Sequence, residues 1–151
     1  MERETHSASR FIPAPPGRVY GALVDPQRLV RWLPPKGATG RVEVFEPQAG
    51  GRYRMTLKFA AGGGKATRDT DVVDGRFVEL VQGERITWEA RFPSDDPAFA
   101  GTMTMTWDLT TKSAGTLVTV TARDVPPGIS RADHEQGIAS SLENLAAYLA
   151  P

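Results

Sequence analysis

An alternation of apolar and polar residues runs through most of the chain and predicts β-strands with one buried face. In GTMTMTWDLT, residues 101–110, two methionines, a tryptophan and a leucine take the odd positions, and threonine and aspartate take the even ones. The similar segments are residues 5–12, 41–44, 50–59, 70–81, 85–92 and 116–123. The pattern therefore predicts seven strands, and the internal Gly75 predicts a bulge or bend in the segment 70–81.

Two short segments between the first two strands have helical spacing instead. Pro15 and Pro16 suit the loop and first turn of a helix, because proline needs no amide partner there. In VDPQRLVRWL, Asp25 is a good N-cap and Pro26 a good first helical residue. The sequence predicts two short helices, of which the second ends at the prolines of residues 34–35.

The C-terminal segment predicts one long helix. Ser130, followed by Asp133 three residues later, resembles a capping box at its start. Leucine or isoleucine recurs at residues 138, 142, 145 and 149, which forms one apolar stripe on a helix of about 20 residues, roughly 30 Å long. A stripe of this length needs a broad apolar partner.

Helices and strands are thus segregated along the chain, which is typical of an α+β fold. A seven-stranded antiparallel sheet with one apolar face can bury that face by curving around the long C-terminal helix. No repeat or linker divides the chain. We expect a single domain over residues 1–151.

Composition excludes several classes of function. The 18 lysine and arginine residues balance 18 aspartate and glutamate residues, so no net charge attracts nucleic acid or an anionic membrane. The absence of cysteine excludes disulfides, a thiolate nucleophile and a cysteine zinc site. The sequence contains neither a signal peptide nor an apolar run long enough to span a membrane. We expect a cytoplasmic protein.

Strict enzyme signatures are also missing: the sequence has no phosphate-binding loop, dinucleotide-binding glycine pattern, nucleophile elbow or paired-histidine metal motif. The glycines at 50–51 and 62–64 fit turns. The histidines, His6 and His134, lie at opposite ends of the chain, and consecutive residues 133–135 on a helix do not converge on one ion. We therefore predict no catalytic residue, no metal and no cofactor, and a solvated first turn around His134.

The sequence resembles the homologues of the activator of the heat-shock chaperone ATPase, within the START-like, birch-pollen-allergen-like (SRPBCC) superfamily of helix-grip folds. The resemblance covers nearly the whole chain and rests on FIPAPPGRVYGALVDPQRLVRWLPP, EPQAGGRYRM, LVQGERITWEARF, GTLVTVTA and GIASSLENLAAYL. The family usually has Gly-Trp at the start of the last helix, where this chain has Gly137 and Ile138. This difference is expected to enlarge or reshape the neighbouring cavity.

The resemblance implies a sheet curved strongly enough to leave a hollow beneath the helix, and methionine adapts well to irregular apolar contents. For each apolar residue of that face, ordinary core packing is the simpler interpretation, and the wall of a ligand cavity is the functional one. The hydroxyl of Ser141 and the ring of Trp32 are expected to border the same space. The candidate cavity residues are Trp32, Tyr53, Met55, Leu57, Phe77, Trp88, Ala90, Met103, Met105, Trp107, Ile138, Ser141, Leu142 and Leu145.

Three functions remain open at this point. The first is the binding of a small hydrophobic or amphipathic molecule, such as a lipid, an aromatic or a polyketide-like compound, between sheet and helix. The second, implied by the resemblance, is a protein-interaction module for a chaperone ATPase in the stress response. The third is a polyketide cyclase or hydratase that acts by positioning its substrate in the same cavity. We favour binding over catalysis, and both a monomer and a homodimer are compatible with the sequence.

Overall fold

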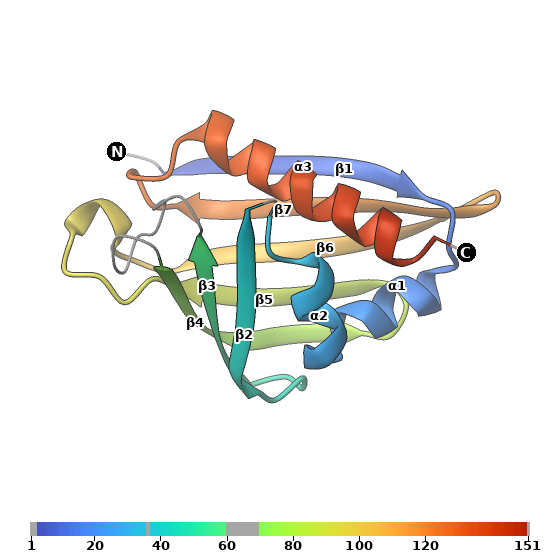
Figure 1. The fold of residues 1–151 in the computed structure, drawn as a ribbon, viewed down its shortest axis with the longest axis horizontal. Helices are drawn as coiled ribbons and strands as arrows, with labels where there is room; N and C mark the ends of the chain where they lie inside the picture. The colour runs from blue at the N-terminus through green and yellow to red at the C-terminus, as the bar shows by residue number, and fades with distance from the viewer. Residues whose placement is uncertain (1–2, 36, 60–69, 151) are drawn as a thin grey trace.

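The computed structural model describes residues 3–35, 37–59 and 70–150. Within these residues, seven strands form an antiparallel sheet in the order β1-β7-β6-β5-β4-β3-β2 (Figure 1). The strands are β1 (Glu4–Ile12), β2 (Ala38–Phe45), β3 (Arg52–Phe59), β4 (Thr70–Val81), β5 (Arg85–Arg91), β6 (Met103–Lys112) and β7 (Gly115–Val125). Strands β2 to β7 pair with their neighbours in sequence, and β1 adds beside β7 at the far edge.

The described helices are α1 (Pro16–Leu23), α2 (Pro26–Trp32) and α3 (Arg131–Tyr148), together with one 3₁₀ turn, η1 (Pro97–Phe99). Both predicted N-caps form. The Asp25 carboxylate accepts a hydrogen bond from the backbone N–H of Gln27 at 2.9 Å, and the Ser130 hydroxyl accepts one from the N–H of Asp133 at 3.1 Å. The predicted α+β architecture, with two short helices before β2 and a long C-terminal helix, is confirmed.

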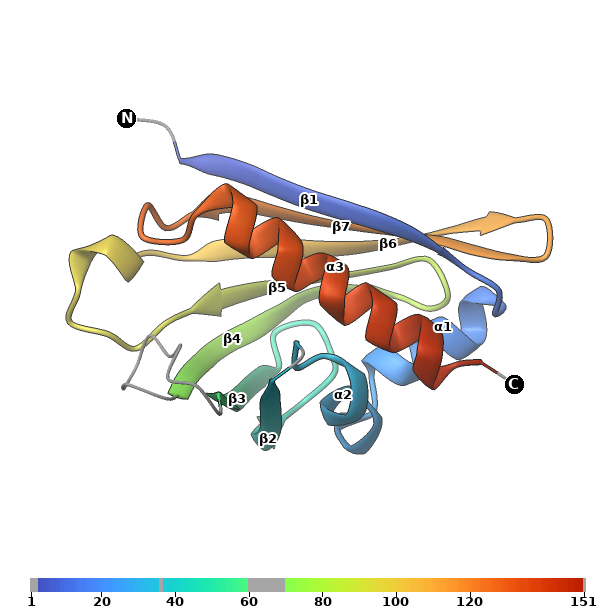
Figure 2. The same cartoon turned by 45° about the horizontal axis from the view of Figure 1, so that its top comes forward.

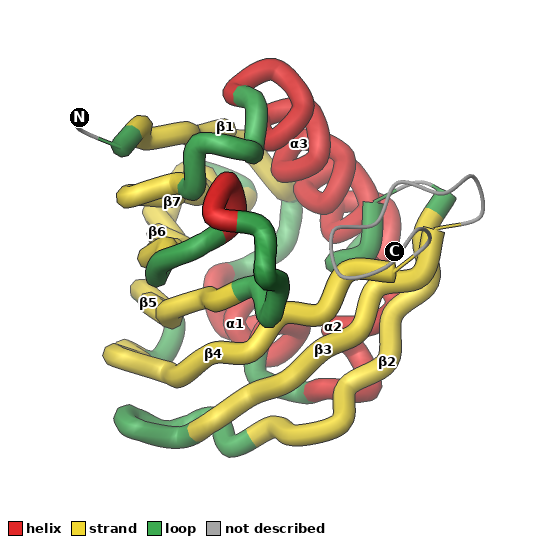
Figure 3. Tube along the Cα trace, turned by 90° about the vertical axis from the view of Figure 1, so that its left-hand side faces the viewer, coloured by secondary structure: helices red, strands yellow, loops and turns green. Residues whose placement is uncertain are grey.

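The sheet curves around α3. Figure 3 shows the sheet nearly end-on, bending from β1 around to β2, with α3 lying along its open side. Figure 2 shows α3 crossing the sheet diagonally while α1 and α2 lie at one end. The helix buries its apolar stripe, Ile138, Leu142, Leu145 and Leu149, against this concave face. The alternation in the strands therefore predicts the inner face of the sheet correctly.

The bulge expected at Gly75 lies slightly further along β4. The register against β5 shifts between Phe77 and Glu79. Gly75 itself is required for a close approach, because a Cβ there would come within 2.3 Å of the Tyr53 ring and within 2.0 Å of the carbonyl oxygen of Glu89. The predicted turn at residues 62–64 lies outside the described residues.

Candidate ligand cavity

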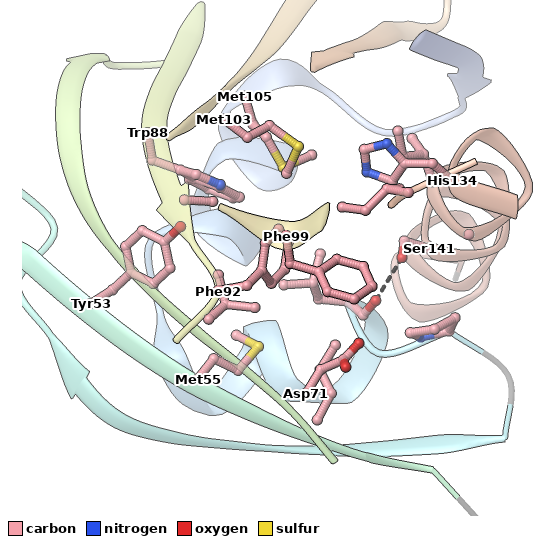
Figure 4. Close-up of a pocket in the computed structure, with 18 of the residues that line it drawn as sticks. Tyr53, Met55, Asp71, Trp88, Phe92, Phe99, Met103, Met105, His134 and Ser141 are labelled. Carbon is pink, nitrogen blue, oxygen red and sulfur yellow. Dashed lines mark hydrogen bonds between the residues drawn. The ribbon is translucent and has the colours of Figure 1, made fainter. Parts of the chain in front are cut away.

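A cavity of about 500 Å³ lies between the concave face of the sheet and the first half of α3 (Figure 4). Strands β2 to β6 provide half of the residues that line it. Leu29 of α2 and Leu33 and Pro35 after it also border the cavity, as do Phe99 of η1 and Ile129 just before α3. The hollow expected from the family resemblance is therefore present in this chain.

Most of the residues expected around the cavity do line it. They are Tyr53, Met55, Leu57, Phe77, Trp88, Ala90, Met103, Met105, Trp107, Ile138 and Ser141. The remaining lining residues, which were not expected at the cavity, are Leu29, Leu33, Pro35, Phe45, Phe59, Asp71, Val73, Phe92, Phe99, Gly128, Ile129, Ser130, Asp133, His134 and Gly137. Phe59, Asp71 and Val73 continue the inward alternation of β3 and β4 and were accessible to the same reasoning. Phe45 was not, because the register of β2 shifts between Val42 and Val44 and breaks the alternation there. The loop residues have no periodic pattern that could have indicated them.

Three expected residues, Trp32, Leu142 and Leu145, are not part of the wall but belong to the solid core. The ring of Trp32 is fully buried and packs edge to face against Trp107, with 5.5 Å between ring centroids, and its Nε1–H donates to the carbonyl oxygen of Ala22. The two leucines lie further along α3. The layers meet there without a gap because α1 and α2 fill that end of the fold.

Aromatic side chains make one side of the cavity rigid. Centroid distances of 5.6 Å from Trp107 to Trp88, 5.8 Å from Trp88 to Tyr53 and 5.6 Å from Tyr53 to Phe77 connect four rings across adjacent strands. The methionines of β3 and β6 lie beside these rings in Figure 4. The wall thus combines a fixed aromatic surface with flexible thioether side chains, which suits apolar contents of variable shape.

Several polar groups of the wall have fixed partners. The Tyr53 hydroxyl donates to the carbonyl oxygen of Glu89 at 2.9 Å, and burial, reinforced by the carboxylates of Asp74 and Glu89, raises the pKa of this phenol far above its ordinary value. The Ser141 hydroxyl donates to the carbonyl oxygen of Leu33 at 2.6 Å. It satisfies an acceptor at the end of α2 and ties that helix to α3.

The indole of Trp107 is different. Its Nε1 is buried, and no hydrogen-bond partner for it is present among residues 3–35, 37–59 and 70–150. A buried donor without an acceptor costs about 1 to 3 kcal/mol. The tryptophan at this position therefore lowers the folding stability while it provides a large apolar surface beside the cavity.

The structure also brings together the two histidines. The expectation that His134 is solvated is wrong, because its side chain is half-buried at the cavity wall. Its neighbour Asp133 is exposed. Nδ1 of His134 lies 2.8 Å from Nδ1 of His6, which is fully buried on β1. The sequence contains no local signal for this contact because 128 residues separate the pair. A cluster of three or more residues suited to binding a metal ion does not occur among the described residues.

Over residues 13–150 the chain matches the family described as Activator of Hsp90 ATPase homolog 1-like protein. The chain belongs to this family. The resemblance inferred from the sequence is therefore confirmed over nearly its whole length. No sequence among the curated proteins matches the chain. Among the helices that the structure describes, none is both long and apolar enough to cross a membrane.

Solved structures of similar proteins share the fold of this family member. Protein CV1439 from Chromobacterium violaceum is 35% identical, with a TM-score of 0.88 and 97% of both chains covered. Protein MLL2253 from Mesorhizobium loti is 23% identical, with a TM-score of 0.74, and covers 97% of this chain and 96% of its own. DynU16, a protein of the dynemicin biosynthetic locus, is 23% identical with a TM-score of 0.69. The match covers 96% of this chain but only 46% of DynU16.

Proposed function

We propose that the protein binds a small hydrophobic or amphipathic molecule in the cavity between α3 and the sheet. The observation that supports this proposal is the cavity of about 500 Å³, because a flush contact between helix and sheet would leave room for little more than water. This volume falls within the range of about 300 to 1,000 Å³ that is usual for small-molecule sites. Most of the strand side chains that line it are apolar, so water inside the cavity would find few hydrogen-bond partners.

The nature of the wall favours a largely apolar ligand with few polar atoms. Met103 and Phe77 offer contact surface without a hydrogen-bond donor, whereas the Ser141 hydroxyl and the His134 ring lie on the α3 side of the cavity. An elongated aromatic, lipid or polyketide-like molecule would place its apolar body against the strands and its polar end near α3. Each buried CH₂ of such a ligand is worth about 0.8 kcal/mol.

The direct test is native mass spectrometry of the protein purified from its own host, combined with titration of N-phenyl-1-naphthylamine. Trp88 and Trp107 lie at the wall, so their emission reports an aromatic guest. We expect a co-purifying ligand or saturable binding of the probe at one site. An apo mass together with no saturable binding would refute the proposal.

A matched pair of variants on α3 localises the binding. Ile138→Trp places an indole at the wall, at the position where the family usually has tryptophan, and should weaken probe binding by filling part of the cavity. Ala139→Trp adds the same indole at the next residue, which is exposed. Binding should be unchanged in the second variant. Equal effects of the two substitutions would place the probe outside the cavity.

The description of the family also supports a second candidate, an interaction with a chaperone ATPase. The measurement that tests it is the ATPase rate of the host chaperone with and without this protein. Stimulation that saturates would support the interaction, and an unchanged rate at saturating protein would exclude it.

A further inference from the structure

The indole of Trp88 places a hydrogen-bond donor in an otherwise apolar part of the cavity wall. In Figure 4 its side chain extends from β5 toward the middle of the cavity, with the nitrogen on the cavity side. The residue as a whole is only 6% exposed. In the part of the chain that the structure describes, its Nε1–H donates to no acceptor. An indole nitrogen only donates, so an acceptor has to come from whatever occupies the cavity.

The nitrogens of Trp88 and Trp107 differ in how accessible they are. Within residues 3–35, 37–59 and 70–150, the Nε1 of Trp107 is the one side-chain nitrogen that is both unpartnered and out of reach of a water molecule. The unpartnered Nε1 of Trp88 is therefore accessible. Because Trp88 lines the cavity and is enclosed elsewhere, this accessible nitrogen faces the cavity.

Three aromatic rings hold the indole of Trp88 in one orientation. The ring centroids of Tyr53, Phe77 and Trp107 lie 5.8, 6.1 and 5.6 Å from it. Edge-to-face and tilted contacts of this kind restrict how far the indole can rotate. A donor whose direction is fixed before a ligand arrives loses little entropy on binding.

The neighbouring hydroxyl groups have already used their hydrogens. The Tyr53 hydroxyl donates to the carbonyl oxygen of Glu89, and the Ser141 hydroxyl donates to that of Leu33. Water can accept from Trp88 in an empty cavity, but a ligand that fills the space displaces it. A ligand without an acceptor at this point leaves the donor unpaired and binds more weakly.

The surroundings of Trp88 favour an uncharged acceptor. The adjacent rings of Tyr53, Phe77 and Trp107 carry no positive charge, and burial, reinforced by the carboxylates of Asp74 and Glu89, raises the pKa of the Tyr53 phenol. An anionic ligand oxygen would meet the same penalty. A carbonyl oxygen accepts a hydrogen bond and has no hydrogen of its own to place, so it fits a donor surrounded by apolar side chains.

We propose that Nε1–H of Trp88 donates a hydrogen bond to a carbonyl oxygen in the apolar body of the bound ligand. This inference rests on the proposed binding function and narrows its ligand class to molecules with a ketone, ester or quinone oxygen on the β5 side of the cavity. A hydrocarbon of the same shape has no atom that accepts from this donor. Trp88 therefore selects among apolar molecules of similar size.

Two probes of nearly the same shape isolate the carbonyl oxygen. 2-Acetylnaphthalene carries it, and 2-isopropenylnaphthalene has a CH₂ group in its place. On the protein side, Trp88→3-benzothienylalanine, introduced by amber suppression, replaces the indole N–H with sulfur and keeps the two fused rings. The same replacement at Trp32 is the matched control, because Trp32 lies in the core outside the wall and its Nε1–H donates to Ala22.

The quantity to compare is the dissociation constant of the alkene divided by that of the ketone, measured by titration calorimetry on each protein. Both constants come from the same protein, so a general loss of stability cancels in the ratio. We expect the replacement at Trp88 to lower the ratio roughly 2- to 10-fold relative to the native protein, which is the effect of one lost hydrogen bond. The replacement at Trp32 should leave it unchanged. An equal fall in both variants would contradict a direct contact with Trp88.

Infrared spectroscopy of bound 2-acetylnaphthalene gives a second measurement, because a hydrogen bond lowers the frequency of the carbonyl stretch. This frequency should be lower in the native complex than for the ketone in hexane, and the replacement at Trp88 should raise it. If the variant does not fold, the native complex alone tests the contact. A stretch at the hexane frequency in the native complex would refute it.

The alkene separates the two proposals. If both probes bind with the same ratio to the native protein and to the two variants, the cavity binds ligands and the role of Trp88 is refuted. If neither probe binds to the native protein, the proposed binding function fails and the hydrogen bond with it.

Discussion

Two buried alanines on the inner face of the sheet provide a stringent test of the cavity. Ala90 on β5 lies between Gly75 and Met103 on the adjacent strands and lines the cavity. Ala122 on β7 is equally buried but lies between Met105 and His6 and does not line it. Replacing each with leucine makes the same chemical change in two different surroundings.

The expected free energies differ in sign. Leucine adds three carbon atoms, and at about 0.8 kcal/mol for each, burial at position 90 contributes about 2 kcal/mol. The loss of side-chain entropy removes about 0.5 to 1 kcal/mol of this gain. At position 122 the added atoms meet a packed core, which costs about 1 to 3 kcal/mol. The two variants should therefore differ by roughly 3 kcal/mol in the free energy of unfolding.

Urea denaturation and thermal melting measure this difference. For a chain of this length each kcal/mol corresponds to about 2 to 4 °C in the melting temperature, so Ala90→Leu should melt roughly 6 to 12 °C above Ala122→Leu. Ala90→Leu should also bind N-phenyl-1-naphthylamine more weakly than the native protein. Equal destabilisation of both variants, with unchanged probe binding in Ala90→Leu, would refute the cavity as the binding site.

Four further outcomes follow from single contacts. Gly137→Ala, where an added methyl group meets nothing within 4 Å, should stabilise α3 by about 0.5 to 1 kcal/mol in urea denaturation; a loss of stability would contradict the open surroundings of Gly137. Gly75→Ala should destabilise by at least about 1 to 3 kcal/mol in the same assay, because the new Cβ meets the backbone oxygen of Glu89; a neutral effect would show that the strands can separate at little cost. Ser130→Ala should cost about 1 kcal/mol through the lost N-cap and Ser130→Gly a few tenths, and equal losses would point to another role for the hydroxyl. The hydrogen bond from the backbone N–H of Ser7, together with Arg131 and His6, lowers the pKa of Glu135. The stabilisation that Glu135 contributes is therefore present above the pKa of this carboxyl in the unfolded chain. It is lost as the pH falls through the lower pKa of the folded chain. Urea midpoints of Glu135→Gln and the native protein should therefore differ at neutral pH and converge in acid, and a constant gap would contradict this.

Much of the fold could be predicted from local patterns. The alternation in β6 separates the buried Met103 and Trp107 from the half-buried Thr104 and Asp108, and the spacing in α3 identifies its buried stripe. Both signals work because a strand repeats every two residues and a helix every 3.6, so a buried face leaves a period in the sequence. The caps at Asp25 and Ser130 were predictable for the same reason, since they depend on neighbouring residues only.

The candidate site was less predictable. Many inward residues of the strands were identified, but Trp32 and Leu142 have the same apolar character as Trp88 and Ile138 and lie in the core instead of the wall. The apolar character of a side chain indicates that it is buried, but it does not indicate whether the side chain faces a cavity or the packed core. Whether a gap remains depends on the curvature of the sheet and on how far α1 and α2 extend into the space beneath α3.

The α+β class, the inner face of the sheet and the apolar stripe of α3 can all be predicted from the amino-acid sequence, because each depends on a short-range period. The space of about 500 Å³ between these two apolar surfaces is visible only in the folded molecule. The same is true of the contact between His6 and His134, which lie at opposite ends of the chain and meet at the edge of that space. Both outcomes depend on distances between layers, which result from packing over the whole molecule and leave no period in the order of the residues.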